Sequence, residues 1–68
     1  MTKEDRVARF SKVEKLAKDK GVTYSQITSE LNMPNSLFSE WKKGKSMPKA
    51  DKLVKIADYF GVDIKELL

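Results

Sequence analysis

Residues 23–48, TYSQITSELNMPNSLFSEWKKGKSMP, limit the folds open to this chain more than any other stretch. Thr23, with Gln26 three residues later, forms a capping-box pattern. That pattern predicts a helix over residues 24–31. Asn32 follows at the point where the chain must turn, and Asn tolerates a positive φ better than most residues other than Gly. The first half of the segment therefore predicts a short helix and a tight turn.

The second half predicts another helix. Pro34 fits the N1 or a neighbouring position of that helix, because its missing N–H needs no partner there, and Gly44 stops the helix after Lys43. Apolar residues spaced to hold the two helices together are Ile27, Leu31, Leu37, Phe38 and Trp41. The short polar residues Asn35, Ser36 and Ser39 are left pointing outward. This is the sequence shape of a helix-turn-helix, whose second helix can lie in the DNA major groove.

Periodic apolar residues predict helices on both sides of this segment. The first helix begins near residues 2–6, with Thr2 as a candidate cap, and ends at Gly21. Its apolar stripe consists of Val7, Phe10, Val13, Leu16 and Ala17. Pro48 opens or precedes a fourth helix that ends at Gly61, with a broad apolar face made of Ala50, Leu53, Val54, Ile56, Ala57 and Phe60.

Asp63 can cap a last short helix that carries Ile64, Leu67 and Leu68. The expected fold is therefore all-α, with five helices, no strand and the helix-turn-helix at the second and third helices. Sixty-eight residues make one domain with a small core. We expect this single domain to span residues 1–68.

The amino-acid composition argues against several classes of function. The chain has no Cys, and therefore no disulfide framework and no Cys-based metal site. It also has no His, which removes the commonest general base and the commonest metal ligand together. Its carboxylates are scattered, and we expect neither an enzyme nor a bound cofactor or metal. No apolar run approaches the roughly 20 residues of a membrane span, and we expect a cytoplasmic, nucleoid-associated protein of a bacterium or a phage-infected cell.

Positive charge is concentrated after the second helix of the motif. Residues 42–55 contain six lysines and one aspartate, which accounts for more than the whole net charge of +4. Clustered lysines are common on solvated surfaces, so charge alone decides little. Their position beside a helix-turn-helix favours nucleic-acid binding.

The strings SEWKKGKSMP (residues 39–48) and KLVKIADYFGVDIKELL (residues 52–68) resemble the XRE-type helix-turn-helix family, the DNA-binding domain of phage repressors and Cro proteins. The resemblance covers about residues 5–68 and implies a compact domain like that of lambda repressor. Thr28 stands where the family usually has a small residue such as Ala, and Asn32 stands at the position of the turn Gly. Both departures are tolerable, because the Thr28 hydroxyl can bond back to the preceding turn.

The resemblance implies that Asn35, Ser36 and Glu40 contact base edges. Asn can pair bidentately with adenine, Ser can bond several bases, and Glu can accept from a cytosine amine. Ser39 is a further candidate from its outward position. Leu37 can touch a thymine methyl group or pack inside the protein, and Trp41 is expected in the core, since duplex DNA offers no free base face.

Candidate phosphate contacts flank these base-reading candidates. Helix N-termini favour anions, and lysines just past the recognition helix can reach the DNA backbone. At Tyr24 the family commonly has a Gln that bonds a phosphate. The full set of expected phosphate contacts is Tyr24, Ser25, Gln26, Lys42, Lys43, Lys45 and Ser46, with Lys49 as a helper.

A monomer of this size would bind an operator weakly, so we expect a homodimer on a palindromic site. The expected dimer contacts are the apolar residues of the last helix, Ile64, Leu67 and Leu68. The chain is expected to be a phage or bacterial repressor, or the N-terminal domain of a longer one with a further C-terminal domain. An antitoxin and a protein-interaction module on the same fold remain alternatives.

Overall fold

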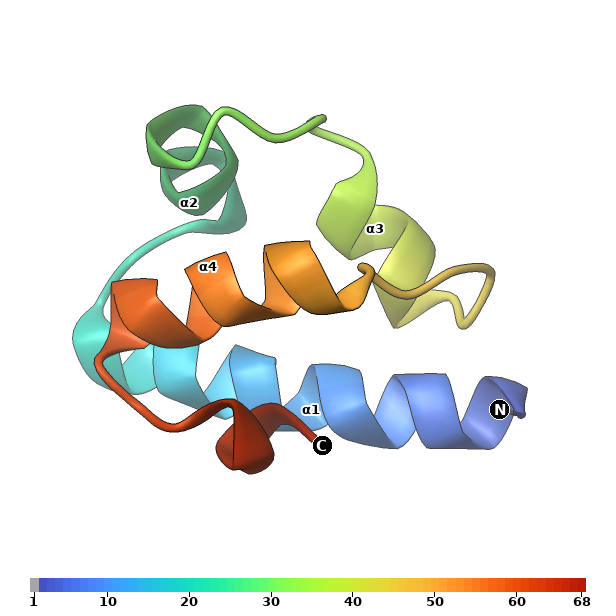
Figure 1. Ribbon diagram of the computed structural model, residues 1–68. Coiled ribbons are helices and arrows are strands. Elements are labelled where there is room, and N and C mark those ends of the chain that lie inside the picture. The colour runs from blue at the N-terminus through green and yellow to red at the C-terminus, as the bar shows by residue number, and fades with distance from the viewer. Residues whose placement is uncertain (1) are drawn as a thin grey trace.

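The computed structural model describes residues 2–68, which form four α-helices and one short 3-10 helix (Figure 1). The elements in chain order are α1 (Lys3–Lys20), α2 (Tyr24–Glu30), α3 (Leu37–Lys42), α4 (Ala50–Phe60) and η1 (Ile64–Leu67). The all-α prediction is confirmed, and these residues contain no strand. The expected fifth α-helix is instead the 3-10 helix η1, in which the Asp63 side chain accepts from the Lys65 N–H.

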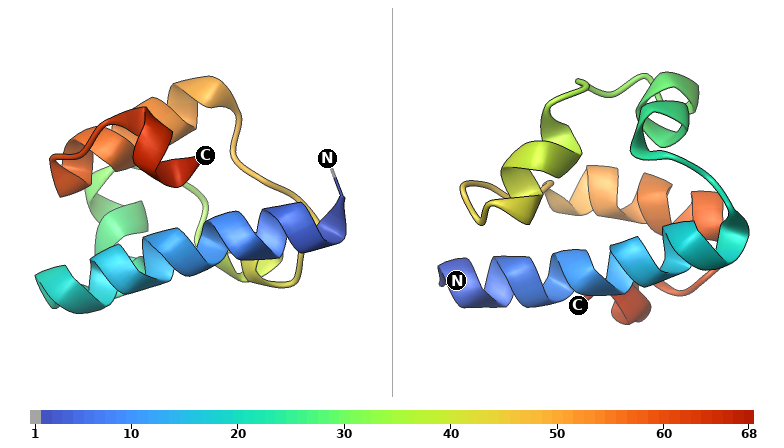
Figure 2. Two further views of the ribbon diagram at one scale, coloured as in Figure 1. Left: turned by 90° about the horizontal axis from the view of Figure 1, so that it is seen from below. Right: turned by 180° about the vertical axis from the view of Figure 1, so that it is seen from behind.

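The longest helix, α1, and α4 lie side by side and run in the same general direction (Figures 1 and 2). On one side of this pair stand α2 and α3, joined by the connection over residues 31–36. On the other side, η1 packs against both α1 and α4. This arrangement leaves α2, α3 and their connection together on one face of the molecule. No helix among residues 2–68 is long and apolar enough to cross a membrane.

Both ends of α1 form as the sequence predicts. Thr2 makes a capping box with Asp5: the Asp5 N–H donates to the Thr2 hydroxyl at 3.2 Å, and the Thr2 N–H donates to the Asp5 carboxylate at 3.3 Å. The donated Thr2 N–H, and then the Thr2 hydroxyl, lower the pKa of Asp5. Gly21 ends the helix with a φ of 74°, in the left-handed region.

The core is built around a chain of aromatic rings that crosses three helices. The Tyr24 ring stacks on Phe38 at 5.0 Å between centroids, and Phe38 stacks on Trp41 at 6.2 Å. From α1, Phe10 contacts both Tyr24 at 5.5 Å and Trp41 at 5.8 Å. These rings fix α2 and α3 on α1, and the prediction that Trp41 is a core residue is confirmed because it is fully buried.

A second contact fixes the far end of α2. The Tyr59 hydroxyl of α4 donates to a Glu30 carboxylate oxygen at 2.7 Å, and the Lys20 ammonium lies 5.4 Å from the centre of the Tyr59 ring. That hydrogen bond, more than burial, raises the pKa of Tyr59. Three helices therefore meet through polar groups at the C-terminal end of α2.

Three residues expected on apolar core faces are exposed. Val7 is 37% exposed because it lies on the N-terminal turns of α1, which extend beyond α4 in Figure 1. On α4, the buried stripe is narrower than expected and consists of Leu53, Ile56 and Ala57. Val54 falls outside this stripe and is 46% exposed, and Ala50 is exposed at the start of the helix.

Candidate nucleic-acid interface

The connection between α2 and α3 is held by backbone geometry and one buried side chain. Asn32 has a φ of 56°, and it is the only residue other than Gly with positive φ among residues 2–68, as predicted. Met33 follows and is buried, with its N–H donating to the Thr28 carbonyl at 2.8 Å. The turn is therefore anchored to both the core and α2, so the residues after it have a defined position.

The predicted start of the third helix is wrong by about three residues. Asn35 and Ser36 were expected inside the helix, but α3 begins at Leu37 with Ser36 as its N-cap residue. The Leu37 N–H donates to the Pro34 carbonyl at 3.1 Å, so a tighter turn precedes the helix. Pro34 is compatible with a helical first turn or with a separate turn before the helix, and the burial of Met33 just before it favours the separate turn. We call residues 34–37 the recognition turn.

The recognition turn and the first turn of α3 present polar groups to solvent. Asn35, Ser36 and Ser39 are exposed, while Phe38 and Trp41 are buried on the opposite side. The Ser39 hydroxyl donates to the Ser36 carbonyl at 3.0 Å, which ties Ser39 locally and leaves its lone pairs outward. The division into a buried and an exposed face of α3 is therefore the expected one.

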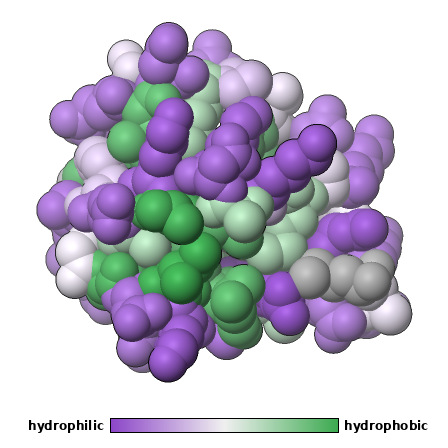
Figure 3. Space-filling model, in the orientation of Figure 1, coloured by the Kyte–Doolittle hydropathy of each residue, from purple (hydrophilic) through white to green (hydrophobic). Residues whose placement is uncertain are grey.

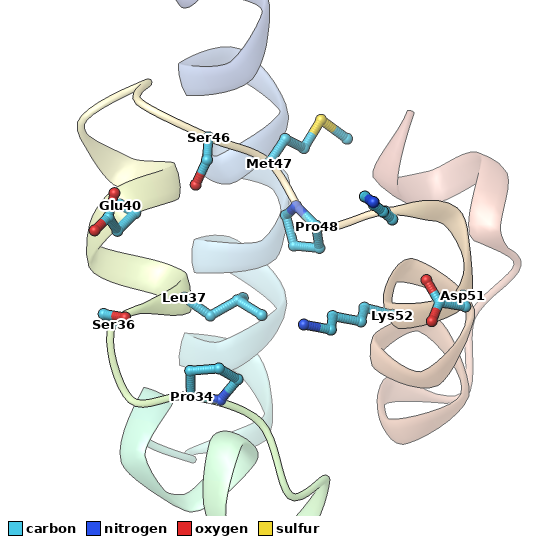
Figure 4. A pocket seen from close by; sticks show the side chains of 10 residues that line it. Pro34, Ser36, Leu37, Glu40, Ser46, Met47, Pro48, Asp51 and Lys52 are labelled. Carbon is cyan, nitrogen blue, oxygen red and sulfur yellow. The ribbon is translucent and has the colours of Figure 1, made fainter.

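Glu40 differs from the other base-contact candidates because it is only partly exposed. It lies in an open groove of about 510 Å³ between α3, the loop over residues 45–49 and the start of α4 (Figure 4). Figure 4 shows Glu40 on α3 and Ser46 on the loop that follows it, with the Lys52 side chain extending from α4 toward Leu37. Sequence analysis did not single out Lys52, since its position opposite α3 depends on how α4 packs.

The end of α3 holds the two lysines with the strongest sequence argument for phosphate binding. The Gly44 N–H donates to the Trp41 carbonyl and the Lys45 N–H donates to the Glu40 carbonyl, at 2.9 and 3.0 Å. This is the hydrogen-bond pattern of a Schellman C-cap. Lys43 and Lys45 flank the capping glycine, and both are exposed. Their backbone positions are therefore set by helix termination.

A contact from α1 supports this cap. The Arg6 guanidinium donates to the Gly44 carbonyl at 3.0 Å. Gly44 is buried, and a Cβ built on it would clash with the side chain of Lys3 and lie 3.2 Å from the Lys3 carbonyl oxygen. The lysine-bearing loop is thus pressed against the N-terminal part of α1. Lys42 and Ser46 are exposed on either side of the cap.

At the N-terminus of α2, the three phosphate candidates differ in their freedom to bind. The Tyr24 ring is half-buried between Phe10 and Phe38, and this burial, followed by the charge of Glu14, raises the pKa of Tyr24. Gln26 completes the predicted capping box, since its side-chain oxygen accepts from the Thr23 N–H at 2.8 Å. Its amide nitrogen keeps two donors, and Ser25 is exposed.

The three expected dimer contacts differ in their exposure to solvent. Leu67 is fully buried in the monomer core, so its own chain already covers it, and the expectation that it needs a partner is wrong. Ile64 is partly buried against the same core, whereas Leu68 is 47% exposed. Figure 3 shows apolar side chains gathered over α4 and the C-terminal segment.

Comparison with known proteins agrees with this arrangement. A family described as a helix-turn-helix domain matches residues 10–68, from the middle of α1 to the end of the chain. The chain therefore belongs to this family, which is a member of the XRE-like helix-turn-helix group. Membership indicates a DNA-binding domain. Searches of curated proteins and of solved structures found no match for the chain.

Proposed function

We propose that this protein is a sequence-specific transcriptional repressor that binds a palindromic operator in double-stranded DNA. The observation that carries the proposal is the placement of exposed Asn35 and Ser36 at the recognition turn, one helix away from exposed Lys43 and Lys45. The recognition turn and α3 enter the major groove, where Asn35, Ser36, Ser39 and Glu40 contact base edges.

Phosphate contacts on both sides of the groove orient the domain. The N-terminus of α2, with Tyr24, Ser25 and Gln26, contacts one strand. The end of α3 and the loop after it, with Lys42, Lys43, Lys45 and Ser46, contact the other. The largest dimension of the backbone is 28 Å. Half-sites one helical turn apart are separated by about 34 Å, so two copies are needed to read them.

Selection of bound duplexes from a random pool tests this function directly. The expected result is a palindrome whose half-sites lie about one helical turn apart. If four to six phosphates are neutralised per subunit, the logarithm of the association constant should fall with the logarithm of salt concentration by about 0.9 per contact. A folded protein that enriches no sequence at modest salt would contradict the proposal.

A paired lysine substitution separates DNA binding from a protein-interaction role. K43A/K45A should weaken binding to all duplexes and lower the salt slope by about 2 per subunit, because two phosphate contacts are lost. The matched control is K15A/K65A, which removes the same charge from exposed positions on the α1–η1 side. Equal effects of the two variants would show that net charge, and not this loop, governs binding.

A further inference from the structure

Thr28 is the only buried residue with a hydroxyl, amide or charged side chain among residues 2–68, and its surroundings are unusual. Its hydroxyl oxygen lies 3.1 Å from the Tyr24 carbonyl oxygen, 3.1 Å from the Ser25 carbonyl oxygen and 3.4 Å from the side-chain oxygen of Asn35. A hydroxyl has a single hydrogen to donate but two lone pairs to offer. Three acceptors therefore compete for one proton.

The competition has a simple resolution. The two α2 carbonyls are nearer than the Asn35 oxygen, which favours donation of the Thr28 hydrogen to one of them and leaves the Thr28 lone pairs for Asn35. A half-turn of the Asn35 amide about χ2 exchanges its oxygen and nitrogen. The amide nitrogen then faces Thr28 and donates a hydrogen to it, which removes the contact between two oxygens.

We propose that Thr28 is a positioning residue that fixes the side-chain amide of Asn35 for reading adenine. One hydrogen of the Asn35 amide nitrogen is donated to Thr28. The other hydrogen, beside the amide oxygen, stays free, and the oxygen points outward. This adjacent donor and acceptor match N7 and the N6 amine of adenine in the major groove. The inference rests on the proposed function, because it names the base that Asn35 recognises.

The position of the pair supports this role. Thr28 is 1% exposed on α2, and Asn35 is exposed on the recognition turn. The Thr28 carbonyl also accepts from the Met33 N–H at 2.8 Å, so the same residue holds both the turn backbone and the Asn35 side chain. A side chain that is already oriented loses less conformational entropy when it binds.

The test compares T28V, which loses the hydroxyl at nearly constant shape, with T28S, which keeps it. In the free protein, nuclear magnetic resonance should show slower solvent exchange of an Asn35 side-chain amide proton in wild type and T28S than in T28V. Equal exchange in wild type and T28V would overturn the proposal without any reference to DNA. Circular dichroism melting checks that both variants fold.

Binding measurements on the selected duplex complete the test. Replacing each adenine in turn by 7-deazaadenine, which lacks N7, should weaken wild-type binding roughly 5- to 100-fold at one position per half-site. We call the affinity for the unmodified duplex divided by the affinity for the 7-deazaadenine duplex the N7 ratio. T28V should reduce the N7 ratio severalfold while the affinity for random duplex stays unchanged. N35A should reduce the N7 ratio to about one. The double variant T28V/N35A should behave like N35A.

The failures of the two proposals are distinguishable. If T28V leaves the N7 ratio at the wild-type value while the operator is still bound, the role of Thr28 is overturned. The role of Thr28 is also overturned if T28V has the same effect on binding in the N35A background as in wild type, because the effect then does not depend on Asn35. A folded wild-type protein that binds no duplex overturns the proposed function itself.

Discussion

Single side chains in this protein divide clearly between those that hold the fold and those that face solvent at the candidate interface. Trp41 and Phe38 are buried, and Ser39, between them in sequence, is exposed. The alternation was predictable because a helix places residues three apart on one face and intervening residues on another. Thr28 was not predictable as a partner of Asn35, since the two lie seven positions apart across a turn and their contact depends on how that turn bends.

The burial of Trp41 predicts how substitutions at this position change the stability of the fold. Its indole N–H is buried without a hydrogen-bond partner in the described structure. W41A should lower the free energy of unfolding by about 3–5 kcal/mol, since it leaves a large cavity. W41F should cost clearly less, because the lost N–H makes no hydrogen bond and most of the ring remains. Urea unfolding followed by circular dichroism measures both, and equal losses would contradict the role assigned to the ring.

At the scale of elements, caps and turns determine where the interface lies. The capping box predicted at Thr23 forms, and the candidate cap Thr2 forms a second one with Asp5. Such motifs involve only four residues, so short-range chemistry is sufficient to recognise them. The start of α3 was misplaced because a proline permits either a helical first turn or a separate turn before the helix, and the packing of Met33 selects the second.

Gly44 and Gly21 form a natural pair for testing the cap of α3. Their φ angles are nearly equal, 76° and 74°, but a Cβ at Gly21 meets nothing within 4 Å, whereas one at Gly44 meets α1. G21A should cost about 1–2 kcal/mol from backbone strain alone. G44A should cost more, because the loop must also move away from Lys3. Thermal unfolding of both variants measures the difference, and an equal loss would show that the contact with α1 is soft.

G44A should also weaken DNA binding at temperatures where it is folded, because Lys43 and Lys45 move with the loop. G21A is the control for this measurement, since Gly21 lies at the far end of α1 from the loop. Binding of the selected duplex by fluorescence anisotropy provides the comparison. Unchanged affinity in folded G44A would argue that the lysines act through flexible side chains alone.

At the scale of the whole molecule, the question is what covers the apolar surface of α4 and the C-terminal segment. Adjacent leucines at the end of the chain have opposite environments: Leu67 is fully buried and Leu68 is 47% exposed. The Lys12 ammonium donates to the Leu68 carbonyl at 2.8 Å, which holds this segment on α1. Leu68 and the partly buried Ile64 therefore stay accessible in this segment, and Val54 on α4 is also exposed.

Substitutions of Leu67 and Leu68 should affect different properties: the first should lower the stability of the fold, and the second should weaken dimerisation. L67A should lower the free energy of unfolding by about 2–5 kcal/mol. L68D should leave thermal unfolding of the dilute protein nearly unchanged and shift the dimer toward monomer, measured by sedimentation equilibrium with and without operator DNA. A wild-type protein that stays monomeric on a palindromic duplex, or an L68D variant that associates as well as wild type, would contradict the dimer surface.

Much of this architecture follows from short stretches of sequence. The helix-turn-helix, the caps, the glycine stops and the basic loop are all readable because each depends on residues a few positions apart. Long-range packing governs the rest: which leucine is buried, that Val54 is exposed, that Lys52 faces α3, and that Thr28 contacts Asn35. These features depend on how helices lie against one another, and a local pattern carries no information about that geometry.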